Sequence, residues 1–321
     1  MAGEKSAGAV LMSGSIPSRY RGRLAPSPTG YLHLGHARTF WTAQQRAKQK
    51  QGTLVLRIED LDSDRCKSEF ANAIFEDLRW FGFHWDEGPD IGGIFAPYVQ
   101  SERLRVYAEA MEKLLACGVI YPCTCSRKDV LRALQAPHAA DEEPIYAGTC
   151  REETMNAATE YAGIFIRAVA GKKLKQKVNW RFRVPDNQPV EFVDGLQGAQ
   201  KFIAGKDFGD FVVWRHDQMP SYQLAVTVDD AAMKITEVVR GADLLVSTAR
   251  QLLLYEALGI AAPAFYHCPL LLDNAGNRLA KRHDALSLRQ LRAEGNVPEE
   301  LQARFGEGHD SGAKSSNEAG R

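Results

Sequence analysis

The chain has 321 residues and 45 % hydrophobic side chains, which is enough for a folded protein of about two domains. Lysine and arginine together number 40, as do aspartate and glutamate, and this net charge of zero excludes a uniformly basic nucleic-acid-binding protein. No apolar run is long enough to span a bilayer, so we expect a cytoplasmic protein without membrane contact. In that compartment, the six cysteines are expected to be thiols or metal ligands.

Residues 1–18 are rich in glycine, alanine and serine, and we expect them to form a disordered leader. Strand-like and helix-like segments then alternate over residues 19–119. The expected strands are 20–25 and 54–59; the expected helices are 37–50, 104–117 and one that Asp62 or Ser63 caps and that runs to Phe81. This alternation predicts an α/β fold with a Rossmann-like, doubly wound parallel sheet, of which residues 19–119 form the first half of the nucleotide-binding catalytic domain.

A turn rich in proline and glycine precedes the 37–50 helix. His33 and His36 lie where that helix begins, and the unpaired N–H groups of a helix start suit a phosphate. Gly30 and Gly35 lack a Cβ, which lets a base or a phosphate approach the backbone closely. The two histidines can donate hydrogen bonds to charge that develops on phosphorus. The alternative is that they cap the helix or are partly buried.

Residues 120–214 break the alternation and are expected to be an insertion that holds zinc and contacts the acceptor. Cys123, Cys125 and Cys150 supply three thiolates, which leaves a tetrahedral zinc site one ligand short. His138 can complete it, and a structural Zn²⁺ would then hold the insertion together, while a metal-free cluster is the alternative. The other three cysteines are expected to be small core residues: Cys66, Cys117 and Cys268.

The second half of the catalytic domain is expected over residues 215–305. Four further strands and one helix are predicted in the insertion and in this half: strands 179–184, 190–193, 221–228 and 269–272, and helix 247–258. A Gly/Asn turn and a basic loop, 277–282, follow, and on their own they indicate only an exposed basic turn. The tail, 306–321, has the composition of a disordered segment.

Four charged or polar residues lie in or beside the expected strands, and one of them, Glu59, ends the strand 54–59 and faces the proposed cleft. Arg23 and Arg240 can each match a carboxylate with a two-point guanidinium fork. The Glu59 carboxylate can bind the ammonium group of an amino acid, although a helix-capping or ion-pair role is the alternative. Tyr222 can hydrogen-bond a ligand or be a core aromatic residue. Together these groups suit an amino acid with an acidic side chain.

The block from Arg23 to His36, with its Pro-Ser-Pro-Thr-Gly turn and its two histidines, resembles the signature region of class I aminoacyl-tRNA synthetases in the glutamyl and glutaminyl branch. The resemblance covers about residues 19–300. It implies an ATP-dependent ligase that binds ATP, with Mg²⁺, at the following residues: Gly30, His33, Gly35, His36 and Lys281. Of these, His33, His36 and Lys281 are implied to be catalytic.

Lys281 is identified through the basic loop. In the resembled family a mobile Lys-Met-Ser-Lys-Ser-type loop occupies this place, and its second lysine neutralises the departing pyrophosphate. Lys281 stands at that position, whereas Arg278 replaces the first lysine and Ala280 replaces the serine. The match is degenerate, so only Lys281 is carried over.

The resemblance also implies L-glutamate as the amino acid, whereas spacing alone leaves glutamine and aspartate open. The glutamate-binding residues that it implies are Arg23, Ala25, Ser27, Glu59, Tyr222 and Arg240. In the resembled Cys-x-Cys…Tyr-x-x-x-Cys pattern the fourth zinc ligand is a tyrosine, and Tyr146 has this spacing to Cys150. The metal ligands implied are therefore Cys123, Cys125, Tyr146 and Cys150.

Only 37 residues follow Asp284, which we expect to be too few for an anticodon-binding domain. A catalytic half alone resembles the glutamyl-queuosine tRNA(Asp) synthetases, which transfer activated glutamate to the queuosine base in the anticodon of tRNA(Asp). We expect such a protein to be a monomer. Three alternatives stay open: charging of the tRNA 3′ end, a ligase with a small-molecule acceptor, and a non-enzymatic zinc module that binds RNA.

Overall fold

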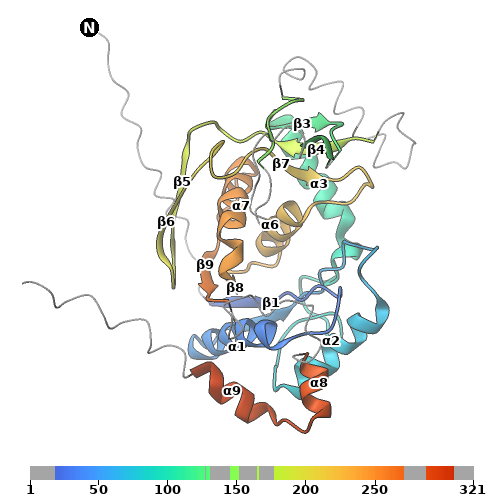
Figure 1. Cartoon of the computed structure of the whole chain (residues 1–321), viewed down its shortest axis with the longest axis vertical. Helices are drawn as coiled ribbons and strands as arrows, with labels where there is room; N and C mark the ends of the chain where they lie inside the picture. The colour runs from blue at the N-terminus through green and yellow to red at the C-terminus, as the bar shows by residue number, and fades with distance from the viewer. Residues whose placement is uncertain are drawn as a thin grey trace, which may run out of the picture.

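The computed structural model describes residues 19–126, 128–130, 145–151, 165, 177–270 and 287–306. Its centre consists of short parallel strands (Figure 1). Strand β1 (Arg21–Leu24) pairs in parallel with β2 (Thr53–Leu56), and β8 (Glu237–Gly241) pairs in parallel with β9 (Ala264–Cys268). The strands predicted at 20–25 and 54–59 are therefore confirmed.

The two strand pairs lie side by side in the same direction. The backbone N–H of Thr236, just before β8, donates to the carbonyl of Arg21 at 2.9 Å. Two residues further along β1, Nη1 of Arg23 donates to the carbonyl of Val239 at 2.8 Å. The spatial order is thus β2, β1, β8, β9, and the carboxyl ends of all four strands face one side, where α/β folds bind their ligands.

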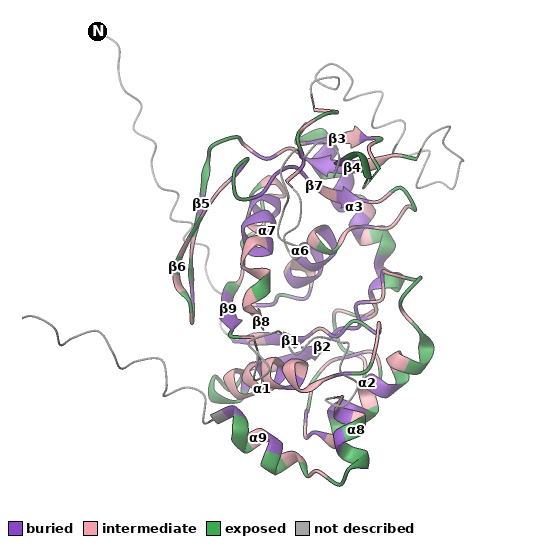
Figure 2. Ribbon diagram, in the orientation of Figure 1, coloured by how far each residue is buried: buried purple, intermediate pink, exposed green. Residues whose placement is uncertain are grey.

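Helices cover both sides of these strands (Figure 1). Helix α1 (Leu34–Gln49) lies on one side, while α6 (Tyr222–Ala232) and α7 (Leu245–Ala257) lie on the other. The buried residues gather between the strands and the helices (Figure 2). The helices predicted at 37–50, 104–117 and 247–258 are confirmed as α1, α3 (Leu104–Ala116) and α7. No helix among the described residues is long and apolar enough to cross a membrane.

The region 120–214 contains a second group of strands. β3 (Ile120–Cys123), β4 (Asn179–Phe182) and β7 (Phe211–Trp214) form an antiparallel sheet in the order β3-β4-β7. β5 (Pro189–Asp194) and β6 (Gly198–Ile203) form an antiparallel ribbon along one edge of the molecule (Figure 1). The strands predicted at 179–184 and 190–193 are confirmed as β4 and β5.

Three predicted elements differ from the structure. The predicted strand 221–228 is the start of helix α6, whose N-cap is Ser221. Its residues 224–230 are all buried, and an apolar run buried on every side has the same pattern in a helix and in a strand. The strand predicted at 269–272 lies earlier, as β9, and residues 271–286 are outside the described part. The cap prediction for α2 (Ser68–Trp80) is also wrong, because Lys67 is its N-cap and Asp62 pairs with Arg65.

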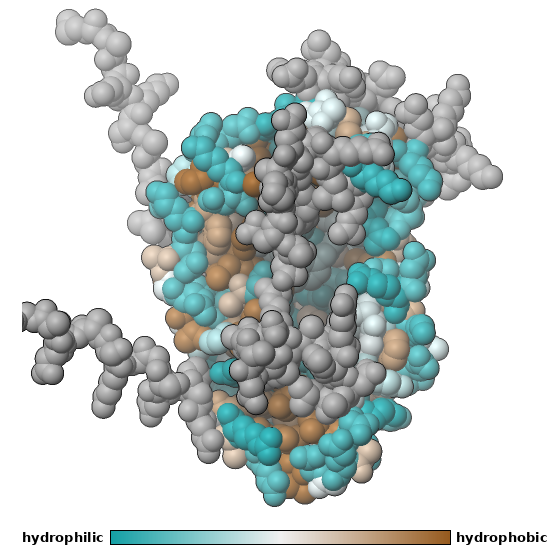
Figure 3. Space-filling view, in the orientation of Figure 1, coloured by the Kyte–Doolittle hydropathy of each residue, from teal (hydrophilic) through white to brown (hydrophobic). Residues whose placement is uncertain are grey.

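The last described segment lies below α1 and α2 in the view of Figure 1. It comprises α8 (Leu288–Ala293) and α9 (Pro298–Gly306). The Gln302 side chain donates to the carbonyl of Phe81 at 2.7 Å, and the Phe305 ring stacks on Phe81. On the face shown in Figure 3, apolar side chains gather between α8 and α9, and hydrophilic side chains dominate the rim. The leader 1–18 and the tail after Gly306 are outside the described residues.

The three cysteines expected in the core differ in their surroundings. Cys268 is buried, as predicted. Cys66 is only half-buried, because it lies in the turn before α2. Cys117 is exposed, so the prediction for it is wrong. It lies at the C-cap of α3, where a helix end leaves the core although its sequence continues the apolar pattern.

Candidate active site

The start of α1 is built by its two histidines. His33 is the N-cap, and its Nδ1 accepts a hydrogen bond from the backbone N–H of Gly35 at 3.1 Å. Nδ1 of His36 accepts from the backbone N–H of His33 at 3.4 Å, and the two rings stack with centroids 3.8 Å apart. The hydrogen bonds therefore confirm the alternative interpretation that these histidines cap the helix.

Capping does not compete with the predicted role in phosphate binding. A neutral imidazole carries one proton, and an accepting Nδ1 places that proton on Nε2. His33 and His36 are both half-buried at the positive end of a helix, and in its neutral form each ring carries its proton on Nε2. The caps thus select the tautomer that anion binding requires.

The surroundings of Gly30 and Gly35 differ. A Cβ on Gly35 would lie 2.9 Å from Cε1 of His33, so this glycine makes room for the capping ring rather than for a ligand. A Cβ on Gly30 would have nothing within 4 Å, which matches the predicted open approach to the backbone. Gly35 thus has a structural reason of its own, whereas the close approach of a ligand to Gly30 stays a prediction.

Arg240 and Tyr222 meet at the carboxyl end of β8. Arg240 is only 4 % exposed, and its Nη1 lies 3.4 Å from the hydroxyl of Tyr222, which is 38 % exposed. The groups that surround the hydroxyl end of Tyr222 desolvate it and raise its pKa, and the Arg240 charge acts to lower that pKa. Tyr222 keeps its hydroxyl protonated as a hydrogen-bonding group, and its exposure contradicts the alternative of a core aromatic residue.

Arg23 and Glu59 lie in the neighbouring part of the same cluster. Glu59 is buried, and its Oε1 accepts from Nη2 of Arg57 at 2.9 Å. Nε of Arg23 lies 3.6 Å from Oδ1 of Asp230, and this buried nitrogen has no hydrogen-bond partner among the described residues. Burial raises the pKa of Glu59, while Arg57 and Arg23 oppose the rise. The predicted ion-pair alternative for Glu59 is thus present in the structure.

Sequence reasoning missed the residues that hold this cluster together. Arg57 is fully buried in contact with Glu59 and Asp230, and its Nη1 donates to Oδ1 of Asp230 at 2.7 Å. Asp229 accepts from Nε of Arg103 at 2.6 Å. The available signal was a charge inside an apolar run, since a buried charge needs a partner. Their sequence separation, 173 residues for Arg57 and Asp230, hid the pairing.

The remaining predicted residues are placed as follows. Ala25 is half-buried and Ser27 is exposed in the turn between β1 and α1. Lys281, with Arg278 and Ala280, lies outside the described residues. Ser287, the first described residue after that loop, forms a β-bridge with His33. The chain therefore returns to the start of α1 directly after the basic loop.

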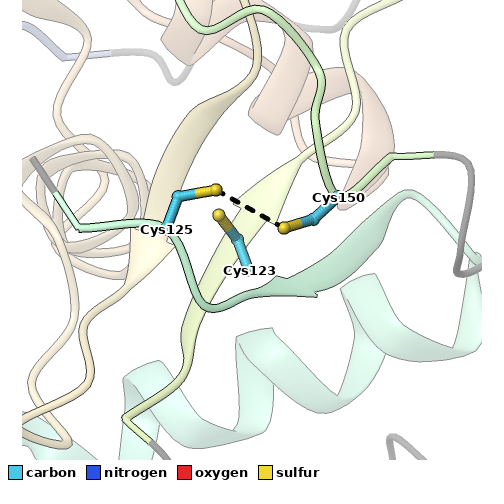
Figure 4. A group of neighbouring side chains, drawn as sticks. All are labelled: Cys123, Cys125 and Cys150. Carbon is cyan, nitrogen blue, oxygen red and sulfur yellow. Dashed lines mark hydrogen bonds between the residues drawn. The ribbon is translucent and has the colours of Figure 1, made fainter. Parts of the chain in front are cut away.

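The cysteine cluster lies at the end of β3. Cys123 and Cys125 come from one side and Cys150 from the other, and all three point toward one another (Figure 4). Their three Sγ atoms lie within 4.8 Å of one another, with 3.6 Å between Cys125 and Cys150. The Tyr146 hydroxyl lies 3.4 Å from Sγ of Cys123 and 3.6 Å from Sγ of Cys125.

These four side chains fit a tetrahedral metal ion. Bonds of about 2.3 Å to a central zinc place two sulfur ligands roughly 3.8 Å apart, close to the separations in the cluster. The Tyr146 hydroxyl lies beside the three sulfur atoms, and its ring lies under the guanidinium of Arg181 at 3.9 Å. His138 is outside the described residues. Among the described residues, this is a candidate metal-binding group.

The chain is similar in sequence to known synthetases. The glutamyl-Q tRNA(Asp) synthetase of Nitratidesulfovibrio vulgaris is 48 % identical over 275 residues, which are 86 % of this chain and 82 % of that protein. The glutamate–tRNA ligase of Sulfurihydrogenibium sp. is 43 % identical over 279 residues, which are 87 % of this chain and 56 % of that protein.

A solved structure agrees with these sequences. The crystal structure of a glutamate tRNA ligase from Elizabethkingia meningosepticum, in complex with its amino acid, has a TM-score of 0.71 at 33 % identity and covers 83 % of this chain and 52 % of that chain. The chain thus spans about half the length of these longer ligases. The family model for the catalytic domain of class I tRNA synthetases (E and Q) matches residues 19–307. The match covers the parallel strands and the histidine-capped helix described above. The chain belongs to the class I tRNA synthetases of the E and Q type, a family of ATP-dependent ligases.

Proposed function

We propose that this chain activates L-glutamate with ATP and transfers it to the queuosine base in the anticodon of tRNA(Asp). The observation that carries the glutamate part is the convergence of Arg240, Arg23 and Glu59, in or just after neighbouring parallel strands, with Tyr222 at the start of α6. Buried guanidinium groups beside a carboxylate suit a ligand with two carboxylates and one ammonium group. The names of two relatives at 48 % identity support the queuosine acceptor.

The first step needs no side-chain nucleophile, because the α-carboxylate of glutamate is already ionised. One of its oxygens attacks the α-phosphorus of ATP, a new P–O bond forms, and pyrophosphate leaves. The Nε2–H groups of His33 and His36 stabilise the charge that develops on the phosphate oxygens. Lys281 neutralises the departing pyrophosphate, and Mg²⁺ accompanies ATP. A hydroxyl of the modified base then attacks the glutamyl carbonyl, loses its proton and releases AMP.

The acceptor is tested with labelled glutamate and two tRNA pools. One pool lacks queuosine but keeps an intact 3′ end; the other carries queuosine, and a 2′,3′-cyclic phosphate blocks both hydroxyls of its terminal ribose. Label should enter only the second pool. Label in the first pool would instead show charging of the 3′ end, the activity named for relatives at 43 % identity. Adenylate formation without label in either pool would indicate a small-molecule acceptor. RNA binding without adenylate formation would indicate a non-enzymatic module.

We also propose that Cys123, Cys125, Tyr146 and Cys150 hold a structural Zn²⁺. The protein purified from zinc-supplemented medium is expected to contain one zinc ion per chain, measured by elemental analysis. Cys150→Ser should lose most of the metal and lower the melting temperature by roughly 5 °C or more, because metal binding contributes directly to folding. Cys117→Ser, at an exposed cysteine away from the cluster, should change neither value.

The fourth zinc ligand is tested separately. Tyr146→Phe should weaken zinc retention against a competing chelator, since the phenol oxygen is lost while the ring stays. His138→Ala should retain zinc as the unaltered chain does. The reverse result would assign the fourth position to His138, and zinc-free protein with an unaltered melting temperature would favour the metal-free cluster.

A further inference from the structure

A fully buried carboxylate–imidazole pair lies behind Arg240. Asp194, the last residue of β5, and His267, in β9, are joined by a contact of 2.6 Å between Oδ2 and Nδ1. Neither side chain is exposed to solvent. The mechanism above uses neither residue, and their sequence separation of 73 residues gives no local reason for the pairing.

The hydrogen bonds around this pair have one consistent direction. The Asp194 carboxylate accepts hydrogen bonds from the backbone N–H groups of Leu196 and Gln197, at 3.0 and 2.8 Å. Burial acts to raise the pKa of Asp194, but these hydrogen bonds and the one from His267 outweigh it, so the pKa is lowered. An ionised Asp194 accepts the Nδ1 proton of His267. Burial and the charge of Arg240 lower the pKa of His267, so its ring is neutral and its Nε2 is an acceptor.

That acceptor faces Arg240. Nε of Arg240 donates to Nε2 of His267 at 3.1 Å, and Nη2 donates to the hydroxyl of Thr248 at 2.6 Å. Arg240 and His267 are also opposite each other in the β8–β9 register. These two hydrogen bonds hold Nε and Nη2 of the guanidinium, while Nη1 donates to the Tyr222 hydroxyl at 3.4 Å. Among the described residues, the named partners account for three of the five N–H groups of the guanidinium, one on each nitrogen.

We propose that Asp194 and His267 are positioning residues that hold the Arg240 guanidinium with its terminal nitrogens toward the amino-acid substrate. The inference rests on the proposed binding of glutamate by Arg240. Two features of the pair suit this role. The carboxylate fixes the imidazole tautomer, and the neutral imidazole accepts a hydrogen bond from a cation without adding a second positive charge. A rigid support of this kind reduces the entropy lost when a ligand carboxylate is bound.

The test compares substitutions at position 267 in ATP–pyrophosphate exchange. His267→Leu removes the acceptor for Arg240, and we expect the KM for glutamate to rise by about 10- to 100-fold, while the KM for ATP changes less than about twofold. His267→Gln can place its amide oxygen near the former Nε2, and it should recover most of the loss. Glu237→Gln removes a buried carboxylate at the other end of β8 and should leave both KM values unchanged.

Three outcomes overturn the inference: an equal rise in both KM values, no recovery in His267→Gln, or an equal effect of Glu237→Gln. Melting temperatures are measured for every variant. If His267→Leu does not fold, Asp194→Asn carries the comparison, and its KM for glutamate should exceed that of His267→Gln. The proposed function fails in a different way, because the unaltered protein would then show no glutamate-dependent exchange at all.

Discussion

Replacing Arg240 by glutamine should reduce kcat/KM for glutamate by roughly 30- to 4,000-fold, the largest effect expected from a single substitution in the amino-acid site. Removing one partner from a buried, charge-assisted contact costs about 2–5 kcal/mol, which corresponds to that range. Arg240 is 4 % exposed and lies among Tyr222, Thr248 and His267, so water cannot replace the lost guanidinium. Glutamate-dependent ATP–pyrophosphate exchange measures the change, and the KM for ATP should remain near its original value.

Arg240→Lys is the informative companion. It keeps the charge but replaces the planar fork by a single ammonium group, which cannot contact His267 and a carboxylate with separate edges. Its activity should lie closer to that of Arg240→Gln than to that of the unaltered chain. Arg46→Gln is the matched control, because Arg46 also pairs with a β8 side chain, Glu237, at 2.6 Å, but at the other end of the strand. A loss of the same size in Arg46→Gln would show that the effect reflects stability and not substrate binding.

Replacing His33 by asparagine should lower kcat for adenylate formation by about 10²- to 10³-fold without unfolding the start of α1. Asparagine is a strong N-cap residue, so the hydrogen bond from Gly35 can be retained. The Nε2–H donor is lost, and removal of one preorganised donor to a developing negative charge has a cost of this order. Single-turnover formation of the adenylate, followed with labelled ATP, gives the rate.

The corresponding change at His36 separates the two histidines. His36→Gln keeps an acceptor for the backbone N–H of His33, as in a capping box, and removes the imidazole donor. We expect a similar loss of rate and a melting temperature close to that of the unaltered chain. His33→Ala, which loses both the cap and the donor, should lose about 1 kcal/mol of stability as well. Full activity in His33→Asn and His36→Gln would contradict the catalytic role and leave both residues as caps.

Local patterns determined much of this protein. The apolar run 20–25 and the helical pattern 37–50 correspond to β1 and α1, because burial on one face imposes a regular spacing of apolar residues. The Cys-x-Cys pair and the distant Cys150 predicted a group of three cysteines that the structure brings together, whereas Tyr146, which lies beside them, was predicted only through the family resemblance. Where a mainly apolar run is buried on every side, as in residues 224–228, spacing alone could not distinguish the helix from a strand.

The sequence by itself thus determined the start of α1, the grouping of three cysteines and the family. Only the tertiary structure decided which charges are paired. Arg57 meets Asp230 across 173 residues, and Asp194 meets His267 across 73 residues. The physical reason is that a buried charge must find a partner, but the partner is chosen by strands that become neighbours only in the folded chain. The spacing of apolar residues indicates which face of a helix or strand is buried. Which residue packs against that face depends on how the helices and strands are arranged in the folded chain.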